Sequence, residues 1–586
     1  MILQSLVEYY ECLAEKGEVS RPGWCSAKVS YALNLRQDGS IAGMIPLKES
    51  VQRGKKTVEV PRNMVVPEMV SRSSGISANF LCDNSKYILG IDKEGAGKRN
   101  VDCFLAAKER HLKILEHVES SCSDAVKAFF LTWNPQEAKE HTEVTEIWED
   151  LTSGVNLVFY VDGRYVQEDE AVAAKWKQEC ENREGGVKGI CLVTGEKTDI
   201  ARIHTAIKGV QGAQSSGAAL VSFNAPAFES YGKEQSYNAP VGNHAVFAYT
   251  TALNYLLSQK DYVRQLGDTT VVFWAEDADT ECQDLFLAAS EPSKENQELL
   301  KGLFDNLEKG RVVDIEGVHK NINLEQSFYI LGLSPNAARL SVRFFYADSF
   351  GRILKHLKEH YERMEIVRPA SDHLEYLGVW RMLQETVNKK SKEKKPQAGM
   401  AGRTFEAVLS GGRYPDSLYS ALLARIRAEQ DDKENYSFKI TRGRAAIIKA
   451  VLLRNYRGLQ MKGEDFVSLN ESCTDVAYIL GREFAVLETI QEEANPEINA
   501  TIKDRYFNSA CATPGIIFPV LFKLKNSHTR KLAEGKRIYF EKILTKLQSQ
   551  IPISEYPKRL TLEQQGLFIL GYYHQMQKRY EKKEEV

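Results

Sequence analysis

From residue 351 to the C-terminus, the chain repeatedly places apolar residues at helical spacing and contains no strand-like run. The stretches "GRILKHLKEHYERM", "SLYSALLARIRAEQ" and "CTDVAYILGREFAVLETIQEEA" show the spacing of amphipathic helices and are rich in strong helix formers. This part of the chain is therefore predicted to be all helical. We divide it into a helical region over 351–460 and a C-terminal helical bundle over 461–586.

Residues 1–350 show a different pattern, in which strand-like runs are interleaved with helical stretches. Alternating residues surround an Asp-Gly pair in 28–48, which predicts a hairpin. Further strands are expected at 156–166, 190–195, 269–276 and 338–347, and helices at 103–118 and 244–258. The fold class is thus predicted as α+β: a mixed α/β region over 1–350, with one or two subdomains, followed by a helical bundle. A chain of 586 residues exceeds one hydrophobic core.

Bulk composition restricts the class of protein. Hydrophobic content of 43% and charged content of 27% suit a soluble protein, and no apolar run approaches the roughly 20 residues that span a bilayer. The N-terminus lacks a basic segment before its apolar residues and a cleavage site, so the chain is predicted to be cytoplasmic, without membrane partners. The ten cysteines are scattered without a C-x-x-C pair, which predicts free thiols.

A net charge of −2 hides three basic segments. Lys439 to Arg457 holds six basic residues and no acidic one, 388–403 contains five lysines with Gly and Pro, and 51–63 forms another basic loop. Such segments are often only solvated, but basic loops beside a basic helix also suit phosphate contacts that ignore sequence. The predicted phosphate contacts are Arg53, Lys55, Lys56, Lys389, Lys390, Lys392, Lys394, Lys395, Arg442, Arg444 and Lys449.

Two polar loops offer donors and acceptors for base edges and phosphates, at 71–90 and at 221–245. The second loop has Asn-Ala-Pro twice, at Asn224 and Asn238, and its Pro and Gly residues oppose regular structure. The alternative is that these side chains satisfy their own turns, cap the helix near His244, or, for Gln235, join a buried network. The candidate contact residues are Arg72, Ser73, Ser74, Asn79, Asn84, Lys86, Lys233, Gln235 and Asn238.

Catalytic patterns are scarce. His356, Glu359 and His360 follow the H-x-x-E-H order of inverted zinc peptidases, so a zinc-dependent hydrolase is the alternative function. Lys355 and Lys358 lie in the same turns, and their positive charge would disfavour binding of a dication. A sequence of this kind more often forms a solvent-exposed helix with surface salt bridges than a zinc site. No Walker A loop or G-x-S-x-G elbow occurs. We therefore expect no catalytic residue, no metal and no cofactor.

Several long stretches resemble one family. They include "MILQSLVEYYE", "RSSGISANFLCDNSKYILG", "CLVTGEKTDIARIHTAIKGVQGAQSSGAALVSFNAPAFESYGKEQSYNAPVGNHAVFAYTTALNYLL", "SPNAARLSVRFF", "RPASDHLEYLGVWRMLQETVNKKSKEK" and "ITRGRAAIIKAVLLRN". Together they are similar to the large subunit of the type I-C CRISPR surveillance complex, Cascade. The resemblance is collinear from Met1 to about Arg457.

This resemblance implies an antiviral-defence ribonucleoprotein in which the large subunit sits at the end of the complex that holds the crRNA 5′ handle. The subunit would recognise a protospacer-adjacent motif in target double-stranded DNA and help open the duplex, while crRNA pairing reads the target. Implied partners are crRNA, the backbone, handle-binding and small subunits, and a helicase-nuclease that performs the cleavage. The two polar loops become the candidate motif-reading and duplex-splitting surface, and Met461 the candidate internal start of a separately translated small subunit.

Overall fold

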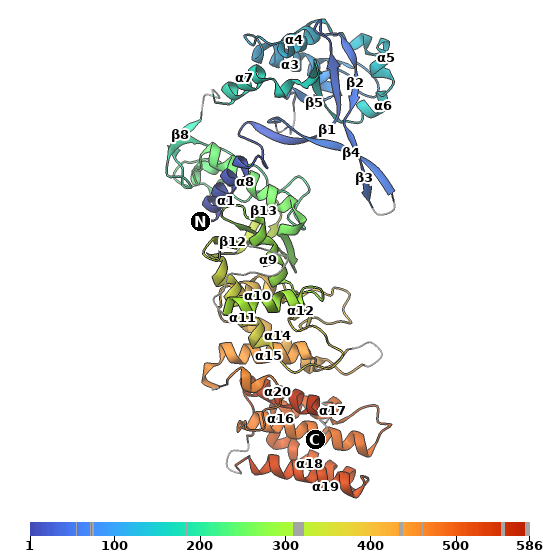
Figure 1. Cartoon of the computed structure of the whole chain (residues 1–586), viewed down its shortest axis with the longest axis vertical. Helices are drawn as coiled ribbons and strands as arrows, with labels where there is room; N and C mark the ends of the chain where they lie inside the picture. The colour runs from blue at the N-terminus through green and yellow to red at the C-terminus, as the bar shows by residue number, and fades with distance from the viewer. Residues whose placement is uncertain are drawn as a thin grey trace. The chain divides into compact units, whose positions relative to one another are not determined.

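The computed structural model (Figure 1) describes residues 1–53, 56–70, 72, 75–181, 186–308, 322–432, 437–459, 461–552 and 557–579, without the side chains of 51–53, 56–58, 181 and 457. The chain forms two compact units. Unit 1 contains Met1, Leu3–Thr205 and Ser222–Ala252, and unit 2 contains Ile2, Ala206–Val221 and Leu253–Val586. The domain boundaries expected at 350 and 460 stay predictions.

Unit 1 is built on a seven-stranded sheet of order β3-β4-β1-β6-β5, with β2 paired to β1 and β7 to β6. The β1–β2 hairpin confirms the strand prediction for 28–48, and β6 with β7 confirms that for 156–166. Among the described strand pairs of this sheet, β1–β6 is parallel and the others are antiparallel. The strands are β1 (Trp24–Leu35), β2 (Ile41–Pro46), β3 (Lys48–Arg53), β4 (Lys56–Pro67), β5 (Cys82–Asn84), β6 (Asn156–Val161) and β7 (Arg164–Tyr165).

Helices α3 and α4 pack against this sheet, and the aromatic rings of Phe129, Phe130, Phe159 and Trp176 fill the core between them. The helices are α1 (Ile2–Glu15), α2 (Ser85–Ile88), α3 (Lys98–Ile114), α4 (Ser121–Thr132), α5 (Thr142–Thr145), α6 (Trp148–Leu151), α7 (Glu170–Glu181) and α8 (Asn243–Ser258). The helices expected at 103–118 and 244–258 are thereby confirmed as α3 and α8, with shifted ends for α3.

The prediction of a strand at 190–195 is wrong. Strand β8 (Val187–Ile190), which pairs with β9 (Lys197–Ile200), ends where the predicted strand begins, and a turn follows. The Cys191 Sγ accepts the backbone N–H groups of Val193 (3.4 Å) and Thr194 (3.5 Å), and Gly195 has φ +76°. These local bonds compete with a strand ladder, so the apolar run folds as a turn.

Unit 2 joins a four-stranded antiparallel sheet, β10-β11-β12-β13, to the helical half of the chain. One continuous core runs from Leu266 to Tyr573, so the sheet and the helices share their apolar interior. The strands are β10 (Val263–Leu266), β11 (Thr269–Ala275), β12 (Ser327–Asn336) and β13 (Arg339–Ser349). The strand predictions for 269–276 and 338–347 are confirmed.

After residue 349 the described part of the chain contains helices and no strand, as predicted. These are α11 (Phe350–Met364), α12 (Val379–Gln384), α13 (Met400–Leu409), α14 (Asp416–Ala428), α15 (Arg442–Asn455), α16 (Val476–Ala494), α17 (Ile502–Ala512), α18 (Pro514–Thr529), α19 (Glu534–Ser549) and α20 (Leu562–Lys578); α9 (Thr280–Ser290) and α10 (Gln297–Glu308) precede β12. The α+β class is therefore confirmed.

Helices α16 and α20 cross at two glycines. A Cβ at Gly481 would lie 1.9 Å from the carbonyl oxygen of Phe568, and one at Gly571 would lie 2.1 Å from that of Tyr478. Such distances are far inside van der Waals contact, so only glycine lets the two backbones approach this closely. Across the same contact, the Tyr478 hydroxyl lies 2.9 Å from His574 Nδ1.

None of the ten cysteines forms a disulfide bond, in agreement with the prediction of thiols. Among the helices described, we find none that combines the length and the apolar character needed to cross a lipid bilayer.

Candidate nucleic-acid interface

A buried carboxylate holds the first polar loop together. Asp83 is 1% exposed and accepts hydrogen bonds from both terminal nitrogens of Arg72, with Nη1 at 2.9 Å. It also accepts the backbone N–H groups of Asn79 and Asn84, each at 2.9 Å. Burial acts to lower the pKa of Arg72, but the hydrogen bonds and charge of Asp83 outweigh it and raise that pKa. Arg72 is thus bound to the protein itself in this structure.

Sequence reasoning missed Asp83. Its partner Arg72 is eleven positions away and lies outside β5, so no helical or strand spacing joins the two residues. The Arg72 guanidinium also lies over the ring of Tyr87, with 4.0 Å between Cζ and the ring centroid. No single sequence spacing marks this arrangement, because it combines the contacts of Asp83 with Arg72, Asn79 and Asn84 and the contact of Arg72 with Tyr87.

The other candidates on this loop differ in exposure. Asn79 is 2% exposed and its Oδ1 accepts the N–H of Val70 at 2.9 Å. Asn84 is the N-cap of α2 and accepts the N–H of Lys86 at 3.1 Å. The Lys86 side chain is 51% exposed and its Nζ lies 4.0 Å from Asp92. Ser73 and Ser74 lie outside the described residues.

The second polar loop contains two short 3-10 turns, η3 (Pro226–Phe228) and η4 (Gln235–Asn238). The amide of Asn238 ties it together: Oδ1 accepts the N–H of Ser230 at 2.8 Å, and Nδ2 donates to the carbonyl oxygens of Lys233 (2.6 Å) and Gln235 (2.9 Å). Gln235 accepts a hydrogen bond from Arg202 Nε at 2.9 Å. Lys233 is exposed. Both amides therefore shape the loop, while Lys233 faces solvent.

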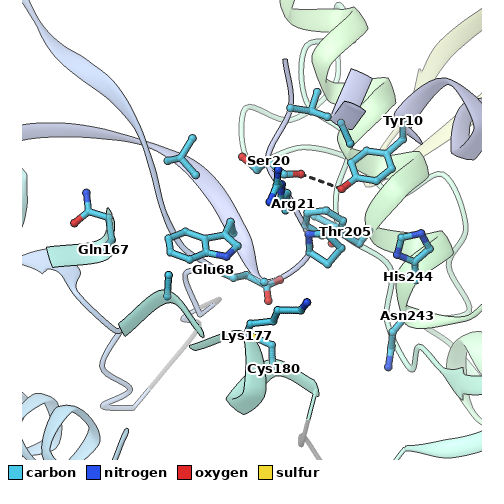
Figure 2. A pocket seen from close by; sticks show the side chains of 18 of the residues that line it. Tyr10, Ser20, Arg21, Glu68, Gln167, Lys177, Cys180, Thr205, Asn243 and His244 are labelled. Atoms are coloured by element: carbon cyan, nitrogen blue, oxygen red, sulfur yellow. Dashed lines mark hydrogen bonds between the residues drawn. The ribbon is translucent and has the colours of Figure 1, made fainter. Parts of the chain in front are cut away.

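Unit 1 also contains a cleft of about 1570 Å³ (Figure 2), formed by α1, residues 17–24, β4, α7 and the start of α8. Tyr10 donates a hydrogen bond to the Ser20 carbonyl at 3.1 Å on its wall, and Lys177 lies opposite His244 in the view. Its carboxylates Glu11, Glu15, Glu68, Glu168 and Asp199 outnumber the cations Arg21, Arg62 and Lys177. This charge balance does not favour phosphate, and none of the predicted contact residues lines the cleft.

The lysine segment of unit 2 is exposed, as a phosphate-tracking segment would require. Lys389, Lys392, Lys394 and Lys395 lie at the surface, and Lys390 Nζ is 3.2 Å from an oxygen of Asp432. In unit 1, Lys55 and the side chains of Arg53 and Lys56 lie outside the described residues.

Arg444, in contrast, is 1% exposed. Its Nη1 donates to the carbonyl oxygens of Phe438 and Lys439, both at 2.9 Å, and its guanidinium lies 3.5 Å from Glu385 and from Glu429. Burial acts to raise the pKa of Glu429, but a hydrogen bond from Ser437 and nearby arginines lower it. The charge of Arg444 is therefore neutralised inside the protein.

Arg442 and Lys449 are buried as well. Arg442 Nη1 lies 3.0 Å from Asp372, and Lys449 Nζ donates to the carbonyl oxygen of Glu365 at 2.5 Å. Burial lowers the pKa of Lys449 to about 8. Helix α15 looks basic in sequence because its carboxylate partners come from distant segments. In this conformation its three candidate residues bond to protein, and phosphate contact by them stays a prediction.

The three residues of the H-x-x-E-H pattern form hydrogen bonds or ion pairs with other residues of the protein. His356 Nδ1 lies 2.6 Å from the carbonyl oxygen of Leu409, and His360 Nδ1 lies 2.6 Å from the hydroxyl of Tyr414. Glu359 pairs with Arg363 at 3.5 Å. Burial and nearby arginines lower the pKa of His360 to about 3. Across the described residues, no group of three or more His, Cys, Asp or Glu side chains could hold a metal ion. Nothing here supports the zinc hydrolase.

Comparison with known proteins shows the family to which the chain belongs. The sequence model of the family described as CRISPR-associated protein (Cas_Csd1) matches residues 6–580, which is nearly the whole chain. No curated protein matches it. The match covers both compact units, including the polar loops of unit 1 and the lysine segment of unit 2. This chain belongs to the Cas_Csd1 family of CRISPR-associated proteins.

Proposed function

We propose that this chain is the non-catalytic large subunit of a cytoplasmic type I-C Cascade. In this role it binds the crRNA-bearing subunits, recognises a protospacer-adjacent motif in duplex DNA and helps open that duplex. A recruited helicase-nuclease then cleaves the DNA. Membership of the Cas_Csd1 family and the collinear resemblance from Met1 to about Arg457 support this proposal.

The structure of the second polar loop supports the proposed recognition of the motif. Because crRNA pairing reads the target, the protein needs to contact only a few base pairs, and a small rigid loop suffices. The Asn238 amide fixes the backbone on both sides of a tight turn, and Lys233 is exposed on that turn. A cation on a rigid turn suits phosphate or a guanine edge.

The test uses assembled particles and duplex targets with every variant of the motif. We expect Lys233→Gln to weaken binding of the preferred motif, with a loss of about 1–3 kcal/mol if Lys233 contacts a base. Asn238→Ala should weaken binding of all motifs alike, because its amide shapes the loop. Asn224→Ala, in the other Asn-Ala-Pro triplet, is the matched control. Normal target location and opening by particles lacking this chain would refute the proposal.

We also propose that Met461 starts a separately translated small subunit. In the whole chain this bundle is joined to the preceding helices: Tyr419 donates to the Leu562 carbonyl at 2.8 Å, and Tyr573 to the Val367 carbonyl at 2.7 Å. A separate copy would expose the α20 face that these contacts cover and would need a partner there. Ribosome profiling or mass spectrometry of the N-terminus of a short product would test the internal start.

A further inference from the structure

Tyr231 stands at the tip of the second polar loop with 98% of its surface exposed. It is the first central residue of a tight turn over 230–233, which is closed by a hydrogen bond from Lys233 N–H to the Ser230 carbonyl at 3.0 Å. Tyr231 has φ +54° and Gly232 has φ +67°. Two positive φ angles define a mirror-image turn that normally takes Asn, Asp or Gly at this position.

A tyrosine here is unfavourable for the backbone. A left-handed conformation costs a residue with a Cβ roughly 1–2 kcal/mol. The surrounding bonds hold it nonetheless, since Asn238 grips Ser230 N–H and the Lys233 carbonyl, the two ends of the turn. Nothing lies within 4 Å of a Cβ built at Gly232, so the tip projects into open space. Strain kept in this way at an exposed site points to a role for the side chain.

The side chains near the Tyr231 ring indicate which class of ligand the ring suits. The loop and its neighbour carry Lys233 and Arg202 against Glu229 and Glu234, and Arg202 lies 3.6 Å from Glu234, so a contact made by the ring need not depend on phosphate. Ser230, Gly232 and Lys233 flank the ring along the chain, and Phe228 of the same loop is 44% exposed. A flat, exposed ring on a rigid polar turn suits the face of an unpaired nucleobase, for which stacking is independent of sequence.

We propose that Tyr231 stacks on an unpaired base of a nucleic acid, at a fork or in a single strand. The assignment to nucleic acid rests on the proposed function, but the contact itself requires neither a motif nor a duplex. It adds to that function a site for the separated strand.

The experiment uses the full chain and a forked DNA whose unpaired arm carries 5-iodouracil or 2-aminopurine. Tyr231→Phe keeps the ring, and Tyr231→Asn removes it while favouring the left-handed turn. With the wild type and Tyr231→Phe, we expect a photocrosslink to the peptide containing position 231 and quenching of 2-aminopurine on binding. Tyr231→Asn should lose both and bind the unpaired arm about tenfold more weakly, with an unchanged salt dependence because no phosphate contact is removed.

Several results would overturn the proposal. The first is that the wild type does not bind the fork, or binds it without a crosslink at residue 231. The second is that Tyr231→Asn binds the unpaired arm like the wild type. The third is that Tyr231→Phe loses as much affinity for the unpaired arm as Tyr231→Asn does. Failure of Tyr231→Asn to enter the particle while its DNA binding is normal would instead identify a protein contact. Failure of the proposed function is distinguishable: the crosslink would persist while particles show no motif preference on intact duplexes.

Discussion

Arg72 and Asp83 form a two-point ion pair that closes the first polar loop around a carboxylate with 1% exposure. The same carboxylate binds the N–H groups of Asn79 and Asn84, so one side chain organises both ends of the loop. Asp83 therefore holds Arg72, Asn79 and Asn84 in place, and these candidate contacts depend on it.

Asp83→Asn should loosen this loop. The amide has one accepting oxygen and a donating NH2 group in place of the second, so the variant loses charge-assisted hydrogen bonds and leaves the Arg72 charge without its partner, at a cost of about 2–3 kcal/mol. Amide hydrogen exchange at Asn79 and Asn84 should accelerate accordingly. Lys86→Gln is the control, since its 4.0 Å pair is exposed and should change stability by less than about 1 kcal/mol. Unchanged protection in Asp83→Asn would refute this view.

The exposed lysines and the buried arginine should behave differently. Replacing Lys389, Lys392, Lys394 and Lys395 with Gln should reduce the salt slope of duplex binding by roughly 0.9 for each lysine that contacts phosphate. Arg444→Gln should leave the slope unchanged and destabilise unit 2 by about 3 kcal/mol, because it removes the buried cation that lies 3.5 Å from both Glu385 and Glu429. Binding titrations over a range of salt and thermal unfolding measure the two effects. A slope insensitive to the lysines would favour a scaffold that does not touch DNA.

The α16–α20 crossing predicts an unusual intolerance of alanine. Gly481→Ala or Gly571→Ala should destabilise the bundle by several kcal/mol, because the new Cβ would overlap a backbone carbonyl that cannot move aside. Gly302→Ala in α10 is the matched control: nothing lies near its added Cβ, and it should stabilise the helix by about 1 kcal/mol. Denaturant unfolding of the full chain checks both. Similar effects at positions 302 and 481 would contradict the close crossing.

Glu483 should make stability depend on pH. The side chain is fully buried in α16, accepts one hydrogen bond from Gln548 at 2.9 Å, and has its pKa raised to about 7 by burial. Between pH 4.5 and 7 the unfolded chain ionises this group while the folded chain keeps its proton. Stability should therefore fall as pH rises through this window, by about 3 kcal/mol for this group. Glu483→Gln should remove that fall and be more stable than the wild type at pH 7.5. An unchanged pH profile would show that Glu483 is ionised in the fold.

Local pattern was enough to predict the helical half, the β1–β2 hairpin and strands β6, β7, β11 and β13, because periodicity and turn residues act over a few positions. It did not predict β3, β4, β5, β10 and β12. It failed at 190–195, where Cys191 draws two backbone N–H groups into a turn that apolar composition conceals. For the candidate interface, sequence located two polar loops and a lysine segment, since residue type and flexibility are local properties.

The sequence alone determined the α+β class, the helical half and several of the strands, and only the tertiary structure decided which charges and amides are available. Helix α15 reads as basic over consecutive residues, yet Arg444 meets Glu385 and Glu429 from other segments and is buried. Asn238 and Tyr231 lie in the same polar loop, and the sequence does not distinguish their roles. In the structure, the Asn238 side chain is hydrogen-bonded to backbone groups, whereas Tyr231 is exposed to solvent. The physical reason is that burial and pairing depend on contacts between residues far apart along the chain, and no local pattern contains them.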